Sequence, residues 1–190
     1  MRLHIGLSRS RAVAVAIALV GALAALVLPR IGASGAAGPS SASAILRDQN
    51  GKAVGSVALA QQVGRVAIGV VVSNLPAGFH GFHIHAVGTC TGDFTSAGGH
   101  FNPTTANHPG HAGDQPVLLV NGDGFASASF ATSRYRLSDL FDADGSAFII
   151  HASADNYANI PTRYSATGPD QMTLNTGDAG GRIACGVISP

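Results

Sequence analysis

Hydrophobic and polar residues alternate with a period of two over several short stretches of the chain after residue 43. Such alternation sends successive side chains to opposite faces of the backbone and is typical of half-buried β-strands. Turn sequences such as Asn50-Gly51 and Asn121-Gly122-Asp123-Gly124 separate the stretches and favour tight hairpins. The pattern predicts eight strands, at residues 44–47, 53–60, 65–72, 79–87, 116–120, 125–131, 147–152 and 182–188.

Two long segments, residues 88–115 and 153–181, show no strand pattern. No stretch with helical periodicity of useful length follows the N-terminal region, although residues 137–141 can form one short turn. Long loops inside a compact domain are usually functional, so we expect the site residues on these two segments.

The N-terminal region differs in character from the rest. Residues 1–11 carry three arginines and residues 12–28 are apolar throughout, which predicts a secretory signal over residues 1–31. If it is not cleaved, the 12–28 run would act as a membrane tether, because its 17 residues are near the lower limit of a spanning length. Residues 32–43 contain only Gly, Ala, Ser and Pro and are expected to form a flexible spacer. Residues 44–190 then form one domain with its own core.

The charge and the cysteine content indicate which class of partner and which cellular compartment to expect. The net charge is +1 and only 11% of the residues are charged, so no nucleic-acid partner is expected. The signal predicts export to the periplasm, the cell envelope or the extracellular space. There Cys90 and Cys185 are expected to form a disulfide bond, two free thiols or zinc-binding thiolates being the alternatives.

Six of the eight histidines lie between His80 and Asp114. His83 and His85 are two residues apart on a predicted strand, so both imidazoles leave the same face and form half of a metal site. His80 is an odd number of residues away, and we therefore interpret it as structural.

The other histidines of this run lie in a segment rich in Gly, Pro, Asn and Thr, which is typical of a loop. His100, His108, His111 and Asp114 offer three imidazoles and one carboxylate. Four such donors fit a closed, tetrahedral zinc site, whereas a more planar array of histidine nitrogens suits Cu(II).

With these features the chain resembles copper,zinc superoxide dismutases of the secreted bacterial type, from about residue 43 to the C-terminus. Several separate motifs occur in the order of that family, which makes chance agreement improbable. The matching motifs are GFHIH at residues 81–85, SAGGHFNP at 96–103, HAGD at 111–114 and GGRIACG at 180–186. The resemblance implies an all-β fold, an eight-stranded antiparallel Greek-key barrel or sandwich with two long functional loops.

The resemblance also implies the roles of individual residues. His100 would bridge two metals, Asp155 would accept hydrogen bonds from one ligand of each, and a bond between Cys90 and Cys185 would pin the metal-site loop to the barrel. Taken alone, Asp155 reads as a turn cap, and a lone histidine at a strand end, like His151, is more often a core residue. The implied ligands are His83, His85, His100 and His151 for copper, and His100, His108, His111 and Asp114 for zinc.

The implied function is that of an antioxidant oxidoreductase, which converts superoxide to dioxygen and hydrogen peroxide by copper redox cycling while zinc is structural. Arg182 would dock the superoxide anion, unless it is a plain surface arginine, and His100 would carry a proton. A copper-buffering module and a dismutase-like domain without turnover are the alternatives. The sequence does not select between a monomer and a homodimer. Lys52 is the only lysine, so we expect little electrostatic guidance of the substrate beyond Arg182.

Overall fold

The computed structural model of the protein describes residues 38–190. The predicted signal (residues 1–31), the 12–28 run and residues 32–37 of the predicted spacer lie outside the described residues. The described part forms nine antiparallel strands. They are β1 (Ser41–Asp48), β2 (Ala53–Gln62), β3 (Arg65–Val72), β4 (Gly78–His80), β5 (Phe82–His85), β6 (Leu118–Val120), β7 (Ala126–Thr132), β8 (Ala147–His151) and β9 (Arg182–Val187).

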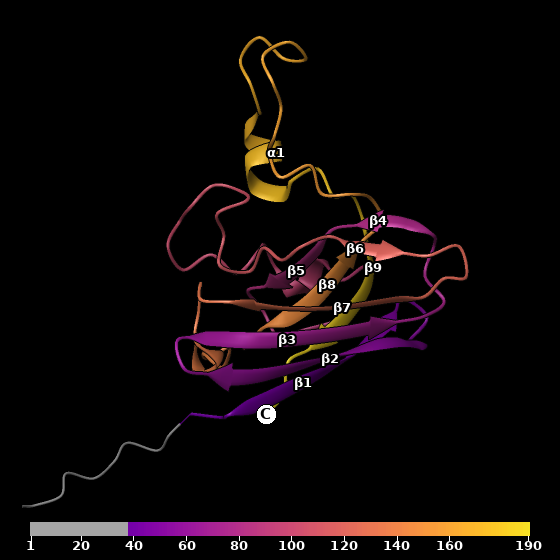
Figure 1. Ribbon diagram of the computed structural model, residues 1–190, viewed down its shortest axis with the longest axis vertical. Coiled ribbons are helices and arrows are strands. Elements are labelled where there is room, and N and C mark those ends of the chain that lie inside the picture. Colours follow the sequence, from indigo (N-terminus) through magenta and orange to yellow (C-terminus); the bar gives the residue numbers. More distant parts are fainter. Residues whose placement is uncertain (1–37) are drawn as a thin grey trace, which may run out of the picture. The chain divides into compact units, whose positions relative to one another are not determined.

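The strands form a curled sheet (Figure 1). Seven strands are joined in the order β5-β8-β9-β1-β2-β3-β7, and β4 pairs separately with β6. Because β6 lies beside β7 and β4 leads directly into β5, the two-stranded sheet bridges the two edges of the larger one. The predicted all-β antiparallel fold is confirmed.

Alternation builds the core as the sequence predicted. On β3, Val66, Ile68, Val70 and Val72 are all at most 2% exposed, while the residues between them are less buried. Burying one aliphatic side chain of this size stabilises the fold by about 1.5 to 3 kcal/mol. These side chains therefore fix the register of β3 against its neighbours, since a shift by one residue would turn them outward.

One predicted strand, residues 79–87, is divided into β4 and β5. The break lies at Gly81, where a Cβ atom would lie 2.6 Å from the Cβ atom of Ala179. The ring nitrogens of His80, on β4, lie 2.7 Å from the carbonyl oxygen of His151 and 2.9 Å from that of Pro76. Both nitrogens are engaged by backbone, which supports the structural interpretation of His80.

The N-terminal boundary of the first strand also differs from the prediction. β1 begins at Ser41, so residues 41–43 of the predicted spacer belong to the sheet, where Ser41 pairs with Ala60 of β2. Their small side chains suffice because the pairing uses backbone groups, and because Ala42 is buried against the core.

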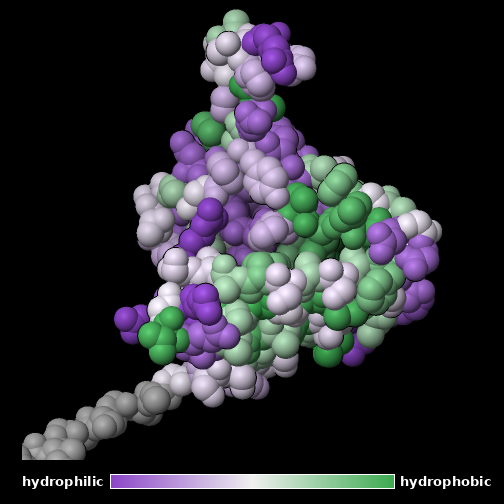
Figure 2. Space-filling model, viewed as in Figure 1, coloured by the Kyte–Doolittle hydropathy of each residue, from purple (hydrophilic) through white to green (hydrophobic). Residues whose placement is uncertain are grey.

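Three short helices complete the fold: η1 (Thr95–Ala97), η2 (Leu137–Leu140) and α1 (Gln171–Thr176). The predicted turn at residues 137–141 is confirmed by η2, whereas α1 was not predicted. The segment with α1 and the loop before it projects from the barrel (Figure 1). Hydrophobic residues gather on the surface over β4 and β6, where Phe79 and Leu119 are each 54% exposed (Figure 2). Between residues 38 and 190, the structure contains no helix long and apolar enough to cross a membrane.

Candidate metal centre

The first long loop folds back across β5 and brings its histidines to those of the strand. The amide of Ile84 donates to the carbonyl of Gly113 at 2.9 Å, and the amide of Phe101 donates to the carbonyl of Ile84 at 2.8 Å. His151 ends β8, which pairs with β5. The barrel and the loop thus converge on one buried region.

All seven predicted ligands meet there, in two groups whose candidate ligand atoms lie within 4.8 Å of one another. We call them the four-histidine group and the mixed group, and His100 belongs to both. The ring centroid of His100 lies 4.0 Å from that of His83. The four-histidine group consists of His83, His85, His100 and His151, and the mixed group of His100, His108, His111 and Asp114.

Backbone carbonyls select the free nitrogen of two histidines in the four-histidine group. Nδ1–H of His85 donates to the carbonyl of Gly98, and Nδ1–H of His151 donates to the carbonyl of Gly180, each at 2.9 Å. The two Nε2 atoms face each other at 3.3 Å. A neutral imidazole that donates through Nδ1 keeps its lone pair on Nε2, so both lone pairs are directed at one point.

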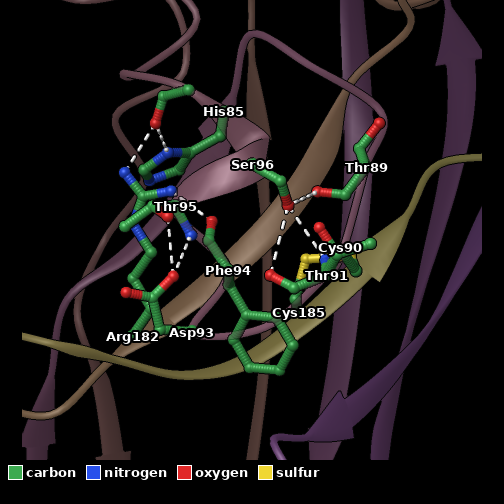
Figure 3. The surroundings of a disulfide bond; sticks show 11 residues. His85, Thr89, Cys90, Thr91, Asp93, Phe94, Thr95, Ser96, Arg182 and Cys185 are labelled. Atoms are coloured by element: carbon green, nitrogen blue, oxygen red, sulfur yellow. Dashed lines mark hydrogen bonds between the residues drawn. A yellow bond between two sulfur atoms is a disulfide. The ribbon is translucent and has the colours of Figure 1, made fainter.

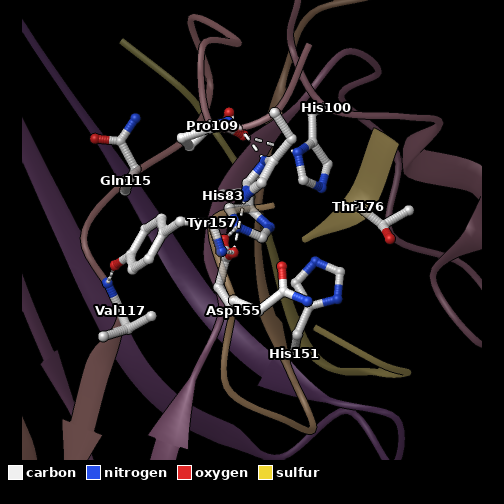
Figure 4. A network of polar contacts seen from close by, with 12 residues as sticks. His83, His100, Pro109, Gln115, Val117, His151, Asp155, Tyr157 and Thr176 are labelled. Carbon is white, nitrogen blue, oxygen red and sulfur yellow. Dashed lines mark hydrogen bonds and ion pairs between the residues drawn. The ribbon is translucent and has the colours of Figure 1, made fainter. Parts of the chain in front are cut away.

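Asp155 links the two groups (Figure 4). Nε2–H of His83 donates to its Oδ2 and Nε2–H of His108 donates to its Oδ1, both at 2.7 Å. The amide of Tyr157 also donates to Oδ1 at 2.7 Å, so Asp155 caps a turn as well. The Nδ1 atom of His83 is buried and has no hydrogen-bond partner, whereas the buried Nδ1 atom of His108 lies 3.0 Å from Oδ2 of Asp114. A buried nitrogen without a partner is costly, and a metal in the four-histidine group would satisfy Nδ1 of His83.

The mixed group is compact. Nδ1 of His100 lies 2.8 Å from Oδ1 of Asp114 and 3.2 Å from Nδ1 of His111. Nδ1 of His108 lies 3.0 Å from Oδ2 of Asp114. Three imidazole nitrogens and one carboxylate, all nearly inaccessible to solvent, fit a closed tetrahedral zinc site.

Burial sets the charge of the four-histidine group, and carboxylates set that of the mixed group. Burial lowers the pKa of His83 to about 4 and that of His151 to about 3. Burial also opposes protonation of His108, but its hydrogen bonds with Asp114 and Asp155 outweigh this and raise its pKa to about 9. His83 and His151 are therefore neutral at pH 7, whereas zinc would have to displace a proton from His108.

Arg182, at the start of β9, lies beside the four-histidine group (Figure 3). Its Nη1 donates to the carbonyl of Phe94, and its Nη2 donates to the carbonyl of Gly98 at 2.6 Å. The Gly98 carbonyl also accepts the bond from His85, so one backbone oxygen orients both side chains. Partial burial lowers the pKa of Arg182, but a guanidinium keeps its charge in proteins.

The predicted bond between Cys90 and Cys185 is present, with the Cα atoms 5.8 Å apart. It ties the start of the first long loop to β9. Phe94 and Ala97 pack in the same small apolar cluster as Cys185. The disulfide thereby fixes the segment whose carbonyls hold Arg182.

Sequence reasoning missed the contribution of α1. The amide of His108 donates to the carbonyl of Leu174 at 2.8 Å, and α1 ends at Thr176 and is capped by Gly177, whose φ is 59°. A Cβ atom on Gly177 would lie 2.1 Å from Oδ1 of Asp155 and 2.5 Å from Nε2 of His108. The capping residue Asp170 and the glycine seven positions later were the available sequence signal for this short helix.

Comparisons with known proteins agree with this geometry. The family described as copper/zinc superoxide dismutase matches residues 53–188. The chain is similar to a Cu-Zn superoxide dismutase of Mycolicibacterium paratuberculosis, 47% identical over 135 residues, which cover 60% of this chain and 57% of the relative. The corresponding protein of Mycobacterium bovis is 46% identical over 138 residues, which cover 62% of this chain and 55% of the relative. The matched region thus spans little more than half the length of these relatives.

A Cu-Zn superoxide dismutase of Brassica juncea is 36% identical over 141 residues, covering 70% of this chain and 88% of the relative. Among solved structures, a SOD-like protein from Bacillus subtilis, crystallised as a double mutant, matches with a TM-score of 0.65 and 35% identity over 76% of this chain and 95% of the other. The clock protein EA4 matches with a TM-score of 0.68 and 30% identity over 82% of this chain and 98% of the other. The family match covers well over half of the chain, and we conclude that the chain belongs to the copper/zinc superoxide dismutase family.

Proposed function

We propose that this protein converts superoxide to dioxygen and hydrogen peroxide, with copper held by the four-histidine group and a structural zinc held by the mixed group. The observation that carries this proposal is the placement of Arg182. Its guanidinium is held by the carbonyl of Gly98, which also orients His85. A copper-buffering protein has no need of a fixed cation beside its metal site.

The ligand roles follow from the nitrogens that the fold leaves free. His85 and His151 would bind copper through Nε2, because their Nδ1–H groups are held by carbonyls. His83 would bind copper through Nδ1, the nitrogen that Asp155 leaves without a partner. His108, also held by Asp155, would present its Nδ1 to zinc.

Copper bound in the four-histidine group supplies the one-electron redox change that the reaction needs. The chain supplies the anion docking and the proton. The guanidinium of Arg182 offers several donors to a small anion and stays charged at the working pH. Nδ1 of His100 faces the mixed group, which leaves Nε2 to hold one of the two protons that the reduced superoxide must receive, and solvent supplies the other.

Reconstitution tests the function against copper buffering. Metal-free protein is loaded with zinc alone or with copper and zinc, and superoxide consumption and peroxide formation are measured. We expect many turnovers per copper only in the doubly loaded protein, with one peroxide formed for every two superoxide ions consumed. Tight copper binding without superoxide consumption would establish a buffering role instead.

We also propose that the protein is exported and acts in the periplasm, the cell envelope or the extracellular space. The predicted signal over residues 1–31 supports this, as does the Cys90–Cys185 disulfide, since such bonds persist in oxidising compartments. Fractionation of the source cells tests the compartment. Recovery with intact residues 12–28 in the membrane fraction would show a tether, and recovery in the cytoplasm would contradict export.

A further inference from the structure

An arginine outside both metal groups contacts the backbone of the mixed group. Arg134 lies two residues after β7. Its Nη1 atom lies 3.0 Å from the carbonyl oxygen of Pro109, 3.1 Å from that of His111 and 3.4 Å from that of Asp114. Two of these three residues carry side chains of the mixed group.

Within the segment 109–114, the backbone makes one other hydrogen bond to a strand of the barrel. The amide of Gly110 donates to the carbonyl of Asn107 at 2.7 Å, which is a bond within the loop. The carbonyl of Gly113 accepts from Ile84 of β5 at 2.9 Å. Arg134 adds a second attachment to the barrel, from the end of β7.

The chemistry of the contact suits a positioning role. A planar guanidinium presents its donors in a fixed arrangement and makes charge-assisted bonds. Arg134 itself is exposed, but His111 and Asp114 are only 4% and 6% exposed, so the bonds act on buried residues. The positive charge of Arg134 would not by itself favour a nearby dication. Any gain in zinc affinity must therefore come from fixing the backbone of the ligand residues.

We propose that Arg134 is a positioning residue of the mixed group, which holds the backbone of His111 and Asp114 so that their side chains are aligned for zinc. This inference rests on the proposed zinc site. Groups that orient metal ligands without touching the metal typically change metal affinity by about 10-fold to 100-fold when removed.

The test compares Arg134→Met with Arg65→Met as a matched control. Arg65 borders the same surface groove as Arg134, but its Nε donates to Gln62 at 2.8 Å. Zinc affinity of the metal-free full chain is measured by competition with a chromogenic chelator, and the geometry of the mixed group by the visible spectrum of bound Co(II). We expect zinc binding at least about tenfold weaker and a changed cobalt spectrum in Arg134→Met. Arg65→Met and the copper affinity of both variants should match the parent.

Unchanged zinc affinity and an unchanged cobalt spectrum in Arg134→Met would overturn the inference. An equal loss in Arg65→Met would also overturn it, since the effect would then be one of charge alone, and an equal loss of copper affinity would point to general unfolding. If Arg134→Met does not fold, Arg134→Lys replaces it. Its single ammonium cannot reproduce the fork, so zinc affinity equal to the parent's would count against the proposal.

Measurements on the parent protein distinguish a failure of the proposed zinc site from a failure of the proposed role of Arg134. A parent that binds no zinc refutes the zinc site itself. A parent that binds zinc and consumes superoxide, combined with an unaffected Arg134→Met, refutes only the role of Arg134.

Discussion

Four imidazoles in the centre, those of His83, His85, His108 and His151, have their metal-facing nitrogen selected by what holds the other nitrogen. For His83 and His108 the partner is Asp155, and for His85 it is a backbone carbonyl. The resemblance to a family indicated which residues are donors. It could not indicate the tautomers, because those depend on the carbonyls of Gly98 and Gly180, which only the folded loops bring into contact.

Gly177 is the residue at which the link through Asp155 is most easily broken. In Gly177→Ala, the new Cβ atom would lie 2.1 Å from Oδ1 of Asp155, at a φ of 59° that disfavours side chains. We expect Asp155 to be displaced and the affinities for copper and zinc to fall together, as measured by chelator competition. Gly69→Ala is the control, since a Cβ atom at Gly69 meets nothing within 4 Å. If both affinities stay at the parental level, Asp155 does not orient the ligands.

The pKa shifts predict how the stability of the metal-free protein depends on pH. The pKa values of His83 and His151 are lowered to about 4 and about 3. Their contribution to the free energy of unfolding is therefore complete above 6.5, the pKa of histidine in the unfolded chain, and is lost as the pH falls toward 4. The pKa of His108 is raised to about 9, so its contribution is complete below 6.5 and is lost as the pH rises through 9.

Thermal unfolding of the metal-free protein between pH 4 and pH 9 should therefore show maximal stability near pH 6.5. His108→Gln should remove most of the decline on the alkaline side. A melting temperature that rises steadily from pH 5 to pH 9 would show that these shifts do not control stability.

At the scale of elements, the eight predicted strands could be found because alternation is a local property of the sequence. The break between β4 and β5 could not, because alternation continues through Gly81 and the obstacle, Ala179, is distant in sequence. The helix α1 has six residues and is too short to show a helical period. The attachment of the loop by Arg134 depends on tertiary contacts alone.

The disulfide joins the first long loop to β9 and should affect both stability and catalysis. It closes a loop of 95 residues, and in a chain-entropy model its removal costs about 4 to 5 kcal/mol. The double variant Cys90→Ala, Cys185→Ala should unfold at a lower urea concentration. It should also turn over more slowly per bound copper, because the segment that holds Arg182 is released. Parental turnover per copper in a destabilised variant would show that the disulfide does not position Arg182.

For the whole molecule, the proposed activity depends on how charge directs an anionic substrate to the metal centre. Dismutases of this family are a standard example of electrostatic steering. Here Lys52 is the only lysine, and the charge of Asp93 acts on Arg182. We expect the rate of superoxide consumption to fall only weakly between low and physiological salt, since a single guanidinium offers little long-range attraction. A steep fall measured over that range would reveal guiding charges that this account omits.

In the proposed function, an anion docked by Arg182 is turned over at the four-histidine group. The most direct measurement is the decay of superoxide in stopped flow with the copper-and-zinc-loaded parent, Arg182→Ala and Arg182→Lys. We expect a rate at least about tenfold lower in the alanine variant, equivalent to about 1.4 kcal/mol, and partial recovery in the lysine variant. The visible spectrum of bound Cu(II) should remain parental in both, because Arg182 is not a ligand. An alanine variant that binds copper and consumes superoxide at the parental rate would contradict the claim.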